Sequence, residues 1–305
     1  MTVSAVVPTL GRTPLLVPCL EALRREGGKG IEIVLVDQGE TAVEIPPGLA
    51  DRVLRPGRNL GFAAGTNLGI GAAAGNWIAA VNDDAVVEPG WLAGLVGALE
   101  ADPGAAAAQG VNLQLSAPDL ADGCGLAWNR WWQAVQIGHG RMAPASGPVR
   151  EVFGVSATAA VFRRSALRAA APGGEVFDSR LGSYYEDVDL AGRLRAAGYR
   201  ALLVPAARAR HAGSATGQTL SRERWRLIYG NRYLAAARLL GKAFWPRLTR
   251  MMARDAIDLV RAVLRGEGAL AAGILSGWPR AARHLAAFAH RRPPLVALGE
   301  IRRFR

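Results

Sequence analysis

The sequence predicts an α/β protein with a mostly parallel central sheet flanked by helices, followed by a helical C-terminal region. Three features lead to this fold class. Apolar strand-like segments alternate with helical segments over about the first hundred residues, strand patterns cease near residue 216, and the remaining chain is helical and rich in arginine. Alternating β and α segments build parallel sheets with helices on both faces.

The first hundred residues contain the alternating segments. The strand-like segments are short apolar runs that end in turn residues: Ser4–Pro8, Ile31–Val36, Arg52–Leu54 and Trp77–Val81. The helical segments cover residues 15–23, Phe62–Ala74 and Pro89–Glu100, with Pro89 suited to a first helical turn. In such sheets ligands bind beyond the carboxyl ends of the strands, so polar residues at those ends are candidates for a site.

The pattern changes after about residue 105. The tryptophan-rich segment Cys124–Gly140 predicts a hairpin or flap, and Glu151–Arg163 predicts one buried strand. Tyr184–Ala197 predicts a helix that begins with acidic residues and ends at Gly198. Tyr199–Val204 predicts a last strand.

The loss of strand patterns near residue 215 predicts a domain boundary. A chain of 305 residues exceeds a comfortable single hydrophobic core. We therefore expect a first domain over residues 1–215, with halves of about 1–105 and 106–215, and a helical, arginine-rich extension over residues 216–305.

Charge and composition limit the class of protein. The formal net charge of +12 comes almost entirely from arginine, since Lys29 and Lys242 are the only lysines, and it indicates an anionic partner or a solvated basic surface. Cys19 and Cys124 have no metal-binding spacing, which fits a reducing compartment. With no basic leader and no apolar run near the roughly 18 residues of a spanning helix, a soluble or peripheral cytoplasmic protein is expected.

Carboxylates follow two of the apolar strands. Asp37 could accept hydrogen bonds from a nucleobase or ribose, or serve as a turn residue or helix cap. Asp83 and Asp84 are adjacent and repel each other unless a cation or donor groups offset their charge, as a divalent ion with positions open for phosphate oxygens would. An Asx turn before Pro89 is the alternative. His211 could complete such a metal site, although a lone histidine is more often structural.

A glycine-rich segment lies between these carboxylates. Residues 59–67 (NLGFAAGTN) offer glycines where backbone can approach a phosphate or sugar, and amide side chains that can bind hydroxyls. The chain does not carry Gly-x-Gly-x-x-Gly after its first strand, and it has no Walker lysine motif. These absences disfavour a dinucleotide-dependent dehydrogenase and a P-loop enzyme.

The densest polar cluster lies at the start of the helix predicted from residue 184. Glu186, Asp187 and Asp189 follow two tyrosines. Acids at a helix start are stabilised by the helix dipole, or one of them can supply a general base in a pocket walled by the tyrosines. Glu186 lies four residues and Asp187 three residues before the apolar Leu190. Helical periodicity alone therefore does not decide which of the two is the base.

The order of these motifs resembles that of family 2 glycosyltransferases of the GT-A fold, and it is most similar to their rhamnosyltransferase-like branch. The resemblance covers about residues 3–240. It rests on the segment VVPTLGR, Asp37, residues 59–67, Asn82-Asp83-Asp84, Glu186-Asp187-x-Asp189 and His211. Each piece alone is unspecific, whereas the combined order and spacing are specific.

The resemblance implies an inverting, metal-dependent hexosyltransferase that moves a sugar from a nucleotide diphosphate to an acceptor hydroxyl. Asp187 would be the catalytic base with Glu186 beside it, and Asp84 and His211 would bind Mn²⁺ or Mg²⁺. The expected nucleotide-sugar-binding residues are Pro8, Thr9, Asp37, Asn59, Gly61, Gly65, Asn67 and Asp83. Among these, Asp37 would contact the base and Asp83 the ribose. The first half of the domain would bind the donor and the second half the acceptor.

The resemblance also implies the partners. The donor would be a dTDP- or UDP-sugar, with rhamnose from dTDP as the first choice. The acceptor would be a glycan or lipid-linked saccharide in cell-surface polysaccharide or glycolipid assembly. A GT-A-like nucleotidyltransferase is the enzymatic alternative, but its Gly-Gly-x-Gly-Thr-Arg loop is absent after the first strand. The non-enzymatic alternative is a basic nucleic-acid-binding protein. No nucleic acid is expected as a partner, because the sequence has no recognition motif for one and carries acids at the site.

The sequence departs from the family pattern in two places. Asn82 occupies the first position of the Asp-x-Asp motif, which leaves the final acid, Asp84, intact. Residues 221–225 (SRERW) resemble the Gln-x-x-Arg-Trp motif of processive synthases but lack the glutamine. Processive extrusion of a polymer is therefore not expected.

The C-terminal region carries a basic amphipathic pattern. Its arginines at helical spacing are Arg247, Arg250, Arg254, Arg261 and Arg265, and its apolar stripe is Leu248, Met252, Leu259 and Val263. Such a helix can lie on an anionic membrane, near a lipid-linked acceptor. It can equally pack on the catalytic domain with its arginines in water.

Overall fold

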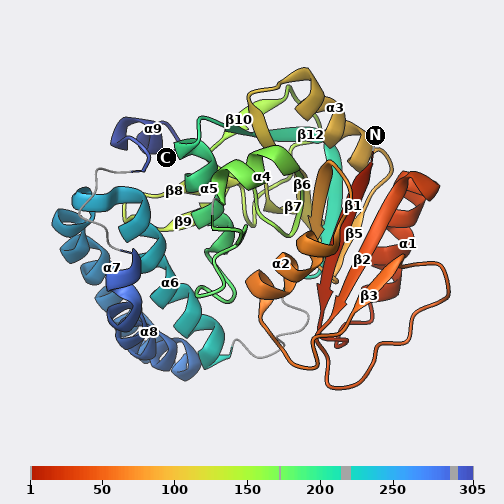
Figure 1. The fold of residues 1–305 in the computed structure, drawn as a ribbon. Helices are drawn as coiled ribbons and strands as arrows, with labels where there is room; N and C mark the ends of the chain where they lie inside the picture. The colour runs from red at the N-terminus through yellow and green to blue at the C-terminus, as the bar shows by residue number, and fades with distance from the viewer. Residues whose placement is uncertain (1, 172, 214–220, 289–294, 305) are drawn as a thin grey trace.

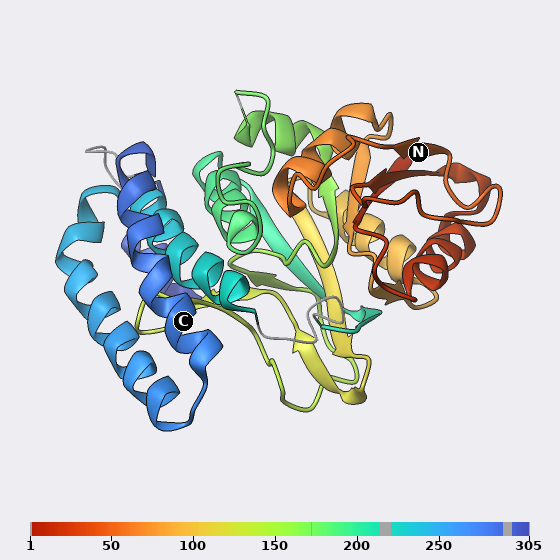
Figure 2. The same ribbon diagram turned by 90° about the horizontal axis from the view of Figure 1, so that it is seen from below.

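The computed structural model describes residues 2–171, 173–213, 221–288 and 295–304. Figure 1 shows the N-terminal strands on one side of the molecule and the C-terminal helices on the other. Figure 2, turned by 90°, shows the same separation, with the strands that follow the first hundred residues lying between the two.

One large sheet organises the chain and confirms the predicted α/β class. Within the described residues ten strands form it, in the order β10-β12-β6-β11-β4-β1-β2-β3, with β5 beside β12 and β7 beside β6. The strands are β1 (Val3–Thr9), β2 (Ile31–Asp37), β3 (Arg52–Leu54), β4 (Trp77–Val81), β5 (Ala85–Val87), β6 (Ala105–Gln114), β7 (Ala117–Gly123), β10 (Arg150–Val152), β11 (Ala159–Arg163) and β12 (Arg200–His211). β1, β2, β3 and β4 pair in parallel, and so do β6 and β12. β8 (Leu126–Trp128) and β9 (Ala134–Gln136) form a separate hairpin, which confirms the predicted one.

Helices cover both faces of the sheet. The first face packs against α1 (Leu16–Gly27) and α3 (Trp91–Ala101), and the second against α2 (Phe62–Ala72), α4 (Arg164–Ala170) and α5 (Glu186–Ala196). Side chains alternate between the two cores because successive strand residues point to opposite faces. In β1, for example, Ala5 and Val7 lie in the first core and Val6 lies in the second.

The C-terminal helices join the sheet through a third core. They are α6 (Arg222–Leu240), α7 (Trp245–Leu264), α8 (Gly268–Phe288) and α9 (Leu298–Arg303), and two 3₁₀ helices, Gly28–Gly30 and Gly241–Phe244, complete the described helical elements. This core combines Phe153 and Val188 with Leu239 and Phe288. A Cβ at Gly192 of α5 would lie 1.7 Å from Leu239 of α6, so only glycine permits this close approach. The boundary predicted near residue 215 lies outside the described residues.

The segment Glu151–Arg163, predicted as one strand, is two. β10 pairs with β12 at the sheet edge, whereas β11 lies between β6 and β4, so the chain must cross two strands between them. The crossing loop is fixed where the buried Gln109 of β6 accepts a hydrogen bond from the Ser156 amide (2.7 Å). The prediction was wrong because continuous apolar character does not show where a chain leaves one pairing partner for another.

The helix expected from Pro89 begins at Trp91 instead. Gly90 adopts a left-handed conformation (φ 86°). Glu26 of α1 caps the helix, accepting hydrogen bonds from the amides of Gly90 and Leu92 (both 2.9 Å). The start of α3 is thus set by a residue more than sixty positions away, which the local sequence does not show.

The amphipathic pattern of α7 divides between packing and solvent. Arg247 and Arg250 stack over Trp132 and Trp131, and Arg254 pairs with Asp258 (2.7 Å). Leu248 packs on the third core, whereas the exposed apolar side chains of this helix include Met252, Val260, Val263 and Leu264. None of the helices that the structure describes combines the length and apolar character needed to span a bilayer.

Candidate active site

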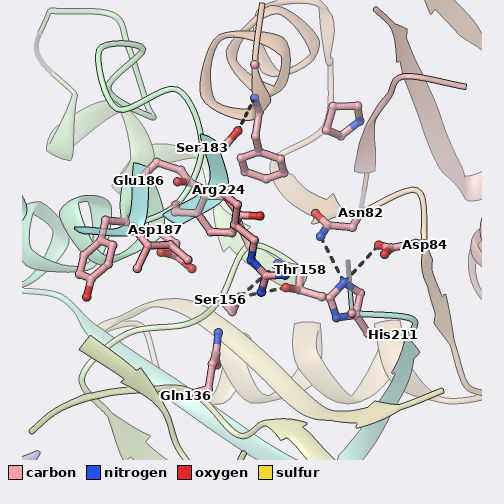
Figure 3. A pocket seen from close by; sticks show the side chains of 18 of the residues that line it. Asn82, Asp84, Gln136, Ser156, Thr158, Ser183, Glu186, Asp187, His211 and Arg224 are labelled. Carbon is pink, nitrogen blue, oxygen red and sulfur yellow. Dashed lines mark hydrogen bonds and ion pairs between the residues drawn. The ribbon is translucent and has the colours of Figure 1, made fainter. Parts of the chain in front are cut away.

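A cavity of about 740 Å³ opens at the carboxyl ends of β1 and β4. It is bounded by the turn after β4, the end of β12, the loop before α5, the β8–β9 hairpin and the first turns of α6. The residues predicted for the site that line it are Pro8, Thr9, Asn59, Gly61, Asp83, Asp84, Glu186, Asp187 and His211. Figure 3 shows Asp84 and His211 on one wall of this cavity and Glu186 and Asp187 on the other.

Three of the predicted residues lie behind the cavity wall. Asp37 accepts hydrogen bonds from the Gly39 and Val43 amides (3.0 and 3.1 Å) and pairs with Arg55 (3.0 Å). It is buried and holds the turn after β2. Its contact with a nucleobase stays a prediction.

Gly65 and Asn67 support the wall from α2. A Cβ at Gly65 would lie 2.4 Å from the amide nitrogen of Gln38, a side chain that lines the cavity and accepts a hydrogen bond from the Leu60 amide. The Asn67 side chain exchanges two hydrogen bonds with the backbone of Phe177 (2.7 and 2.9 Å). Both residues thus shape the site from outside, and direct contact with the donor stays a prediction for each.

Strand register brings Asp84 and His211 together. β5 pairs with β12 so that His211 faces Ala85, directly after Asp84. The Asp84 carboxylate lies 3.1 Å from Nε2 of His211, and the Asp122 carboxylate lies 2.9 Å from Nδ1. Burial alone would lower the pKa of His211, but the hydrogen bonds of Asp122 and Asp84 outweigh it and raise the pKa to about 9.

This pair fits a divalent metal that shares its coordination with a ligand. An imidazole oriented by a carboxylate on its other nitrogen is the usual arrangement of a metal-binding histidine. Among the described residues no group of three or more His, Cys, Asp or Glu side chains is placed to hold a metal ion. A metal bound here would therefore take most of its ligands from phosphate oxygens and water, as Mg²⁺ does.

Asp83, next to this pair, faces the first strand. Its carboxylate accepts a hydrogen bond from the hydroxyl of Thr9 (2.6 Å). Burial raises the pKa of Asp83 to about 6, and the Thr9 hydroxyl opposes that rise. The contact places both predicted donor-binding residues at one point, where β1 and β4 end side by side.

The opposite wall carries two buried acids with different surroundings. Burial raises the pKa of Asp187 to about 6, and hydrogen bonds from the Val188 amide, the Ser156 hydroxyl and the Ala157 amide restrain the rise. Burial and the Asp187 charge raise the pKa of Glu186 well above its ordinary value, and its Oε2 has no hydrogen-bond partner among the described residues. The donors around Asp187 therefore favour its charged form, whereas burial favours the protonated form of Glu186.

The loop before these acids has a strained backbone. Tyr184 and Tyr185 both adopt left-handed conformations (φ 67° and 72°), which cost free energy in residues with side chains. Asn231 of α6 holds the loop, because its amide group donates to the carbonyls of Leu181 (2.7 Å), Ser183 (3.0 Å) and Tyr184 (2.8 Å). The turn aims the start of α5 into the cavity.

Asp189 lies on the same helix but points away from the cavity. Its carboxylate is fully buried and pairs with Arg193 (2.8 Å) and with Arg238 of α6 (2.7 Å). The residue therefore ties α5 to the C-terminal helices.

Four residues of the site were not predicted as site residues. Ser156 holds Asp187, Asp122 orients His211, Asn231 fixes the strained loop, and the guanidinium of Arg224 reaches into the cavity (Figure 3). Only Arg224 lies in a segment with a recognisable pattern, the SRERW sequence at the start of α6. The others act on residues at least thirty positions away, so only the fold shows them.

Comparison with known proteins identifies the family. The model of glycosyl transferase family 2 matches residues 4–169. The chain belongs to this family. The matched segment covers most of the strands of the sheet and the turn that carries Asp83 and Asp84, and it ends before the acids of this glycosyltransferase's α5. A search of curated protein sequences finds no significant match.

Solved structures show the same fold at low identity. TarS of S. aureus is 14% identical (TM-score 0.51; 77% of this chain, 40% of that chain). GalNAc-T7, solved with UDP, GalNAc and Mn²⁺, is 15% identical (TM-score 0.56; 78% and 50%). The mannosyltransferase PcManGT from Pyrobaculum calidifontis, solved with GDP-Man and Mn²⁺, is 19% identical (TM-score 0.52; 93% and 75%). This glycosyltransferase spans half or less of the length of the first two, and the likeness shows the GT-A-like fold.

Proposed function

We propose that this chain is an inverting glycosyltransferase that moves a hexose from a nucleoside diphosphate to an acceptor hydroxyl, with Asp187 as the base. One observation carries the proposal. A single cavity has an ionised, hydrogen-bonded carboxylate on one wall and an aspartate–histidine pair suited to a metal-bound diphosphate on the other. Membership of glycosyl transferase family 2 and the arrangement of the cavity both support this proposal.

In the proposed reaction the chain's own groups move one proton and position two substrates. The acceptor oxygen attacks the anomeric carbon, and its proton passes to the Asp187 carboxylate. The bond from that carbon to the diphosphate oxygen breaks, and the diphosphate leaves with the bonding electron pair. Attack from the face opposite the leaving group inverts the configuration, and no covalent intermediate forms. Glu186, neutral beside Asp187, keeps the negative charge on the single base.

Asp84 and His211 would hold Mn²⁺ or Mg²⁺. Such an ion offsets the negative charge that develops on the departing diphosphate. Arg224 supplies a further positive charge from the opposite side of the cavity, where its guanidinium lies over the Tyr184 ring (5.7 Å). Thr9, Asp83, Asn59 and Gly61 lie where the nucleoside would bind.

The donor and acceptor are proposed at the level of class. One similar structure holds UDP and GalNAc, and another holds GDP-Man. We therefore add GDP-sugars to the dTDP- and UDP-sugars that the sequence resemblance implies, with rhamnose from dTDP still the first choice. The acceptor would be a glycan or lipid-linked saccharide of cell-surface polysaccharide or glycolipid assembly. The exposed apolar side chains of α7 support docking of the cytoplasmic protein on an anionic membrane, which liposome flotation with and without acidic lipid tests.

A donor panel tests the proposal. Each nucleotide sugar is incubated with the protein and Mn²⁺, and both thermal protection and release of nucleoside diphosphate are measured. We expect one donor to protect the protein and to be consumed slowly by water. The proposal is wrong if no nucleotide sugar binds, or if the binding survives Asp84→Asn combined with His211→Ala.

A further inference from the structure

A second cavity lies beside the catalytic one, between the C-terminal helices and the β8–β9 hairpin. Its volume is about 360 Å³. Four residues line both cavities: Ala134, Val135, Tyr185 and Ile228. Tyr185 directly precedes the acids of α5, so a molecule in the second cavity reaches the catalytic cavity past the residue that begins the base-bearing helix.

The lining of this cavity combines positive charge with aromatic rings. Four arginines, Arg232, Arg254, Arg261 and Arg265, face two carboxylates, Asp258 and Glu267. The Asp258 carboxylate already pairs with Arg254 (2.7 Å), and it also accepts a hydrogen bond from the Tyr229 hydroxyl (3.2 Å). Trp225, Tyr229 and Tyr185 supply the rings.

Arg232 forms the buried part of this lining. It is almost fully buried between the rings of Tyr229 and Tyr233 (5.6 and 5.0 Å) and pairs with Asp255 (2.7 Å). Its Nε and one terminal nitrogen have no hydrogen-bond partner among the described residues. A buried cation left with free donors favours an anion nearby.

Arg261 and Arg265 form the open rim. Both are exposed, both lie on the last turn of α7 or just after it, and neither has an ion pair with another described residue. Arginine binds phosphate and carboxylate groups through two parallel hydrogen bonds, and aromatic rings pack against the apolar faces of sugars. The rim and the rings thus fit the two ends of one charged saccharide.

We propose that the second cavity is the acceptor subsite and that it binds a sugar acceptor through an anionic group, phosphate or carboxylate. The inference rests on the proposed function, because it takes Asp187 in the neighbouring cavity as the base. The anionic group binds at Arg261 and Arg265, a sugar ring packs on Trp225 and Tyr229, and the reacting hydroxyl passes Tyr185 toward Asp187. The positive charge of the rim selects against neutral acceptors.

Calorimetric titration with the donor site blocked tests this subsite. The full chain is saturated with Mn²⁺ and the nucleoside diphosphate chosen by the donor panel, and glucose 1-phosphate, glucuronate and glucose are titrated in separate arms. We expect at least one of the two anionic sugars to bind at least tenfold more tightly than glucose. The arm that binds more tightly distinguishes phosphate from carboxylate.

A matched pair of variants locates the binding. Arg261→Gln with Arg265→Gln should weaken the anionic probe at least tenfold, while Arg250→Gln with Arg283→Gln, which removes the same charge outside both cavities, should not. Both double variants should bind the donor as tightly as the unchanged protein does, and they should hydrolyse it at the same low rate. Equal probe affinity in the two double variants, or no preference for either anionic sugar over glucose, overturns the subsite.

The controls separate this inference from the proposed function. If the donor binds normally and the protein binds glucose 1-phosphate, glucuronate and glucose with equal affinity, only the subsite is wrong. If no nucleotide sugar binds at all, the proposed function itself fails. The two arginines could instead serve only to stabilise the C-terminal end of α7, where the helix dipole is negative. In that case the melting temperature of their double variant falls and its affinity for the probe stays unchanged, and this result also overturns the subsite.

Discussion

Buried acids occur in two regions of this molecule, and their partners differ. Where α5 meets the C-terminal helices, and among those helices, Asp178, Asp189 and Asp255 each pair with an arginine. In the catalytic cavity, Asp84 and Asp187 have no arginine or lysine partner among the described residues, and Asp187 is held by neutral donors instead.

The difference separates structural acids from chemical ones. An acid paired inside the protein has its charge offset permanently, so it can brace two elements but cannot exchange a proton or a ligand. An acid that lacks such a partner leaves its charge available to a substrate, and for Asp187 burial raises the pKa, which records the cost in stability. Four expected outcomes test this division, from the largest effect to the smallest.

Removing divalent metal should have the largest effect. Among the described residues, the ion pair of Asp84 is with His211, and neither arginine nor lysine pairs with it, so the diphosphate should need an added ion to bind beside this carboxylate. Chelation should abolish glycosyl transfer measured by product formation, and Mn²⁺ or Mg²⁺ should restore it. Full transfer in excess chelator would place Asp84 among the structural acids.

Substituting the base should come next. Asp187→Asn should keep donor binding and reduce transfer by on the order of a hundredfold or more, the scale of lost general-base catalysis. Glu186→Gln is the matched control, because burial favours the protonated form of Glu186 and its Oε2 has no hydrogen-bond partner among the described residues. If Glu186→Gln is inactive and Asp187→Asn turns over normally, the two assignments must be exchanged.

Releasing the strained loop should cost less. Asn231→Ala removes three hydrogen bonds from the loop that sets the direction of α5. We expect kcat to fall by roughly tenfold with the KM for the donor nearly unchanged, because poor positioning of a base acts on the chemical step. Asn231→Asp, which keeps the size of the side chain but cannot donate, should behave like the alanine variant. A change in donor KM alone would contradict the positioning role.

The pH dependence of stability should give the smallest effect. The folded-state pKa of Asp187 is about 6, above its ordinary value of 3.8, so folding favours its protonated form. Its contribution to stability is full below pH 3.8 and is lost as the pH rises through 6.

Substitution should therefore change stability in opposite directions in the two regions. Asp187→Asn should raise the free energy of unfolding by on the order of 1 to 3 kcal/mol at pH 8 and by little at pH 4. Asp189→Asn should lower it by about 3 to 5 kcal/mol at pH 8, because a fully buried carboxylate that pairs with two partly buried arginines, Arg193 and Arg238, is lost. Denaturant unfolding at the two pH values measures both. Equal destabilisation by both variants would remove the distinction between the regions.

The sequence predicts the parallel strands of the first hundred residues well and the later strands less well. β1, β2 and β4 are short apolar runs that end at polar residues, so their existence and the placement of Asp83 and Asp84 follow from local pattern. β6 was not predicted because it begins with four alanines, which favour helix when no partner strand is considered. It is a strand because β11 and β12 pair with it on either side.

The site divides in the same way. The acids themselves stand at strand and helix ends and can be found by reading along the chain. Their supporting residues cannot, because the Asp122–His211 and Ser156–Asp187 contacts depend on where strands cross. Periodicity left Glu186 and Asp187 equivalent, and the family resemblance alone named Asp187. The structure adds a physical difference, because Asp187 accepts hydrogen bonds from Val188, Ser156 and Ala157, whereas Oε2 of Glu186 has no partner among the described residues.

The close contact between Gly192 and Leu239 has a consequence for how the protein is made. α5 is synthesised about thirty residues before α6, so Asp189 has only Arg193 to pair with, and the tyrosine turn has no Asn231, until α6 has left the ribosome. The strands of the sheet therefore leave the ribosome before the helix that holds this turn, so the nascent chain can pair its strands first and gains the contacts that fix the start of α5 only afterwards.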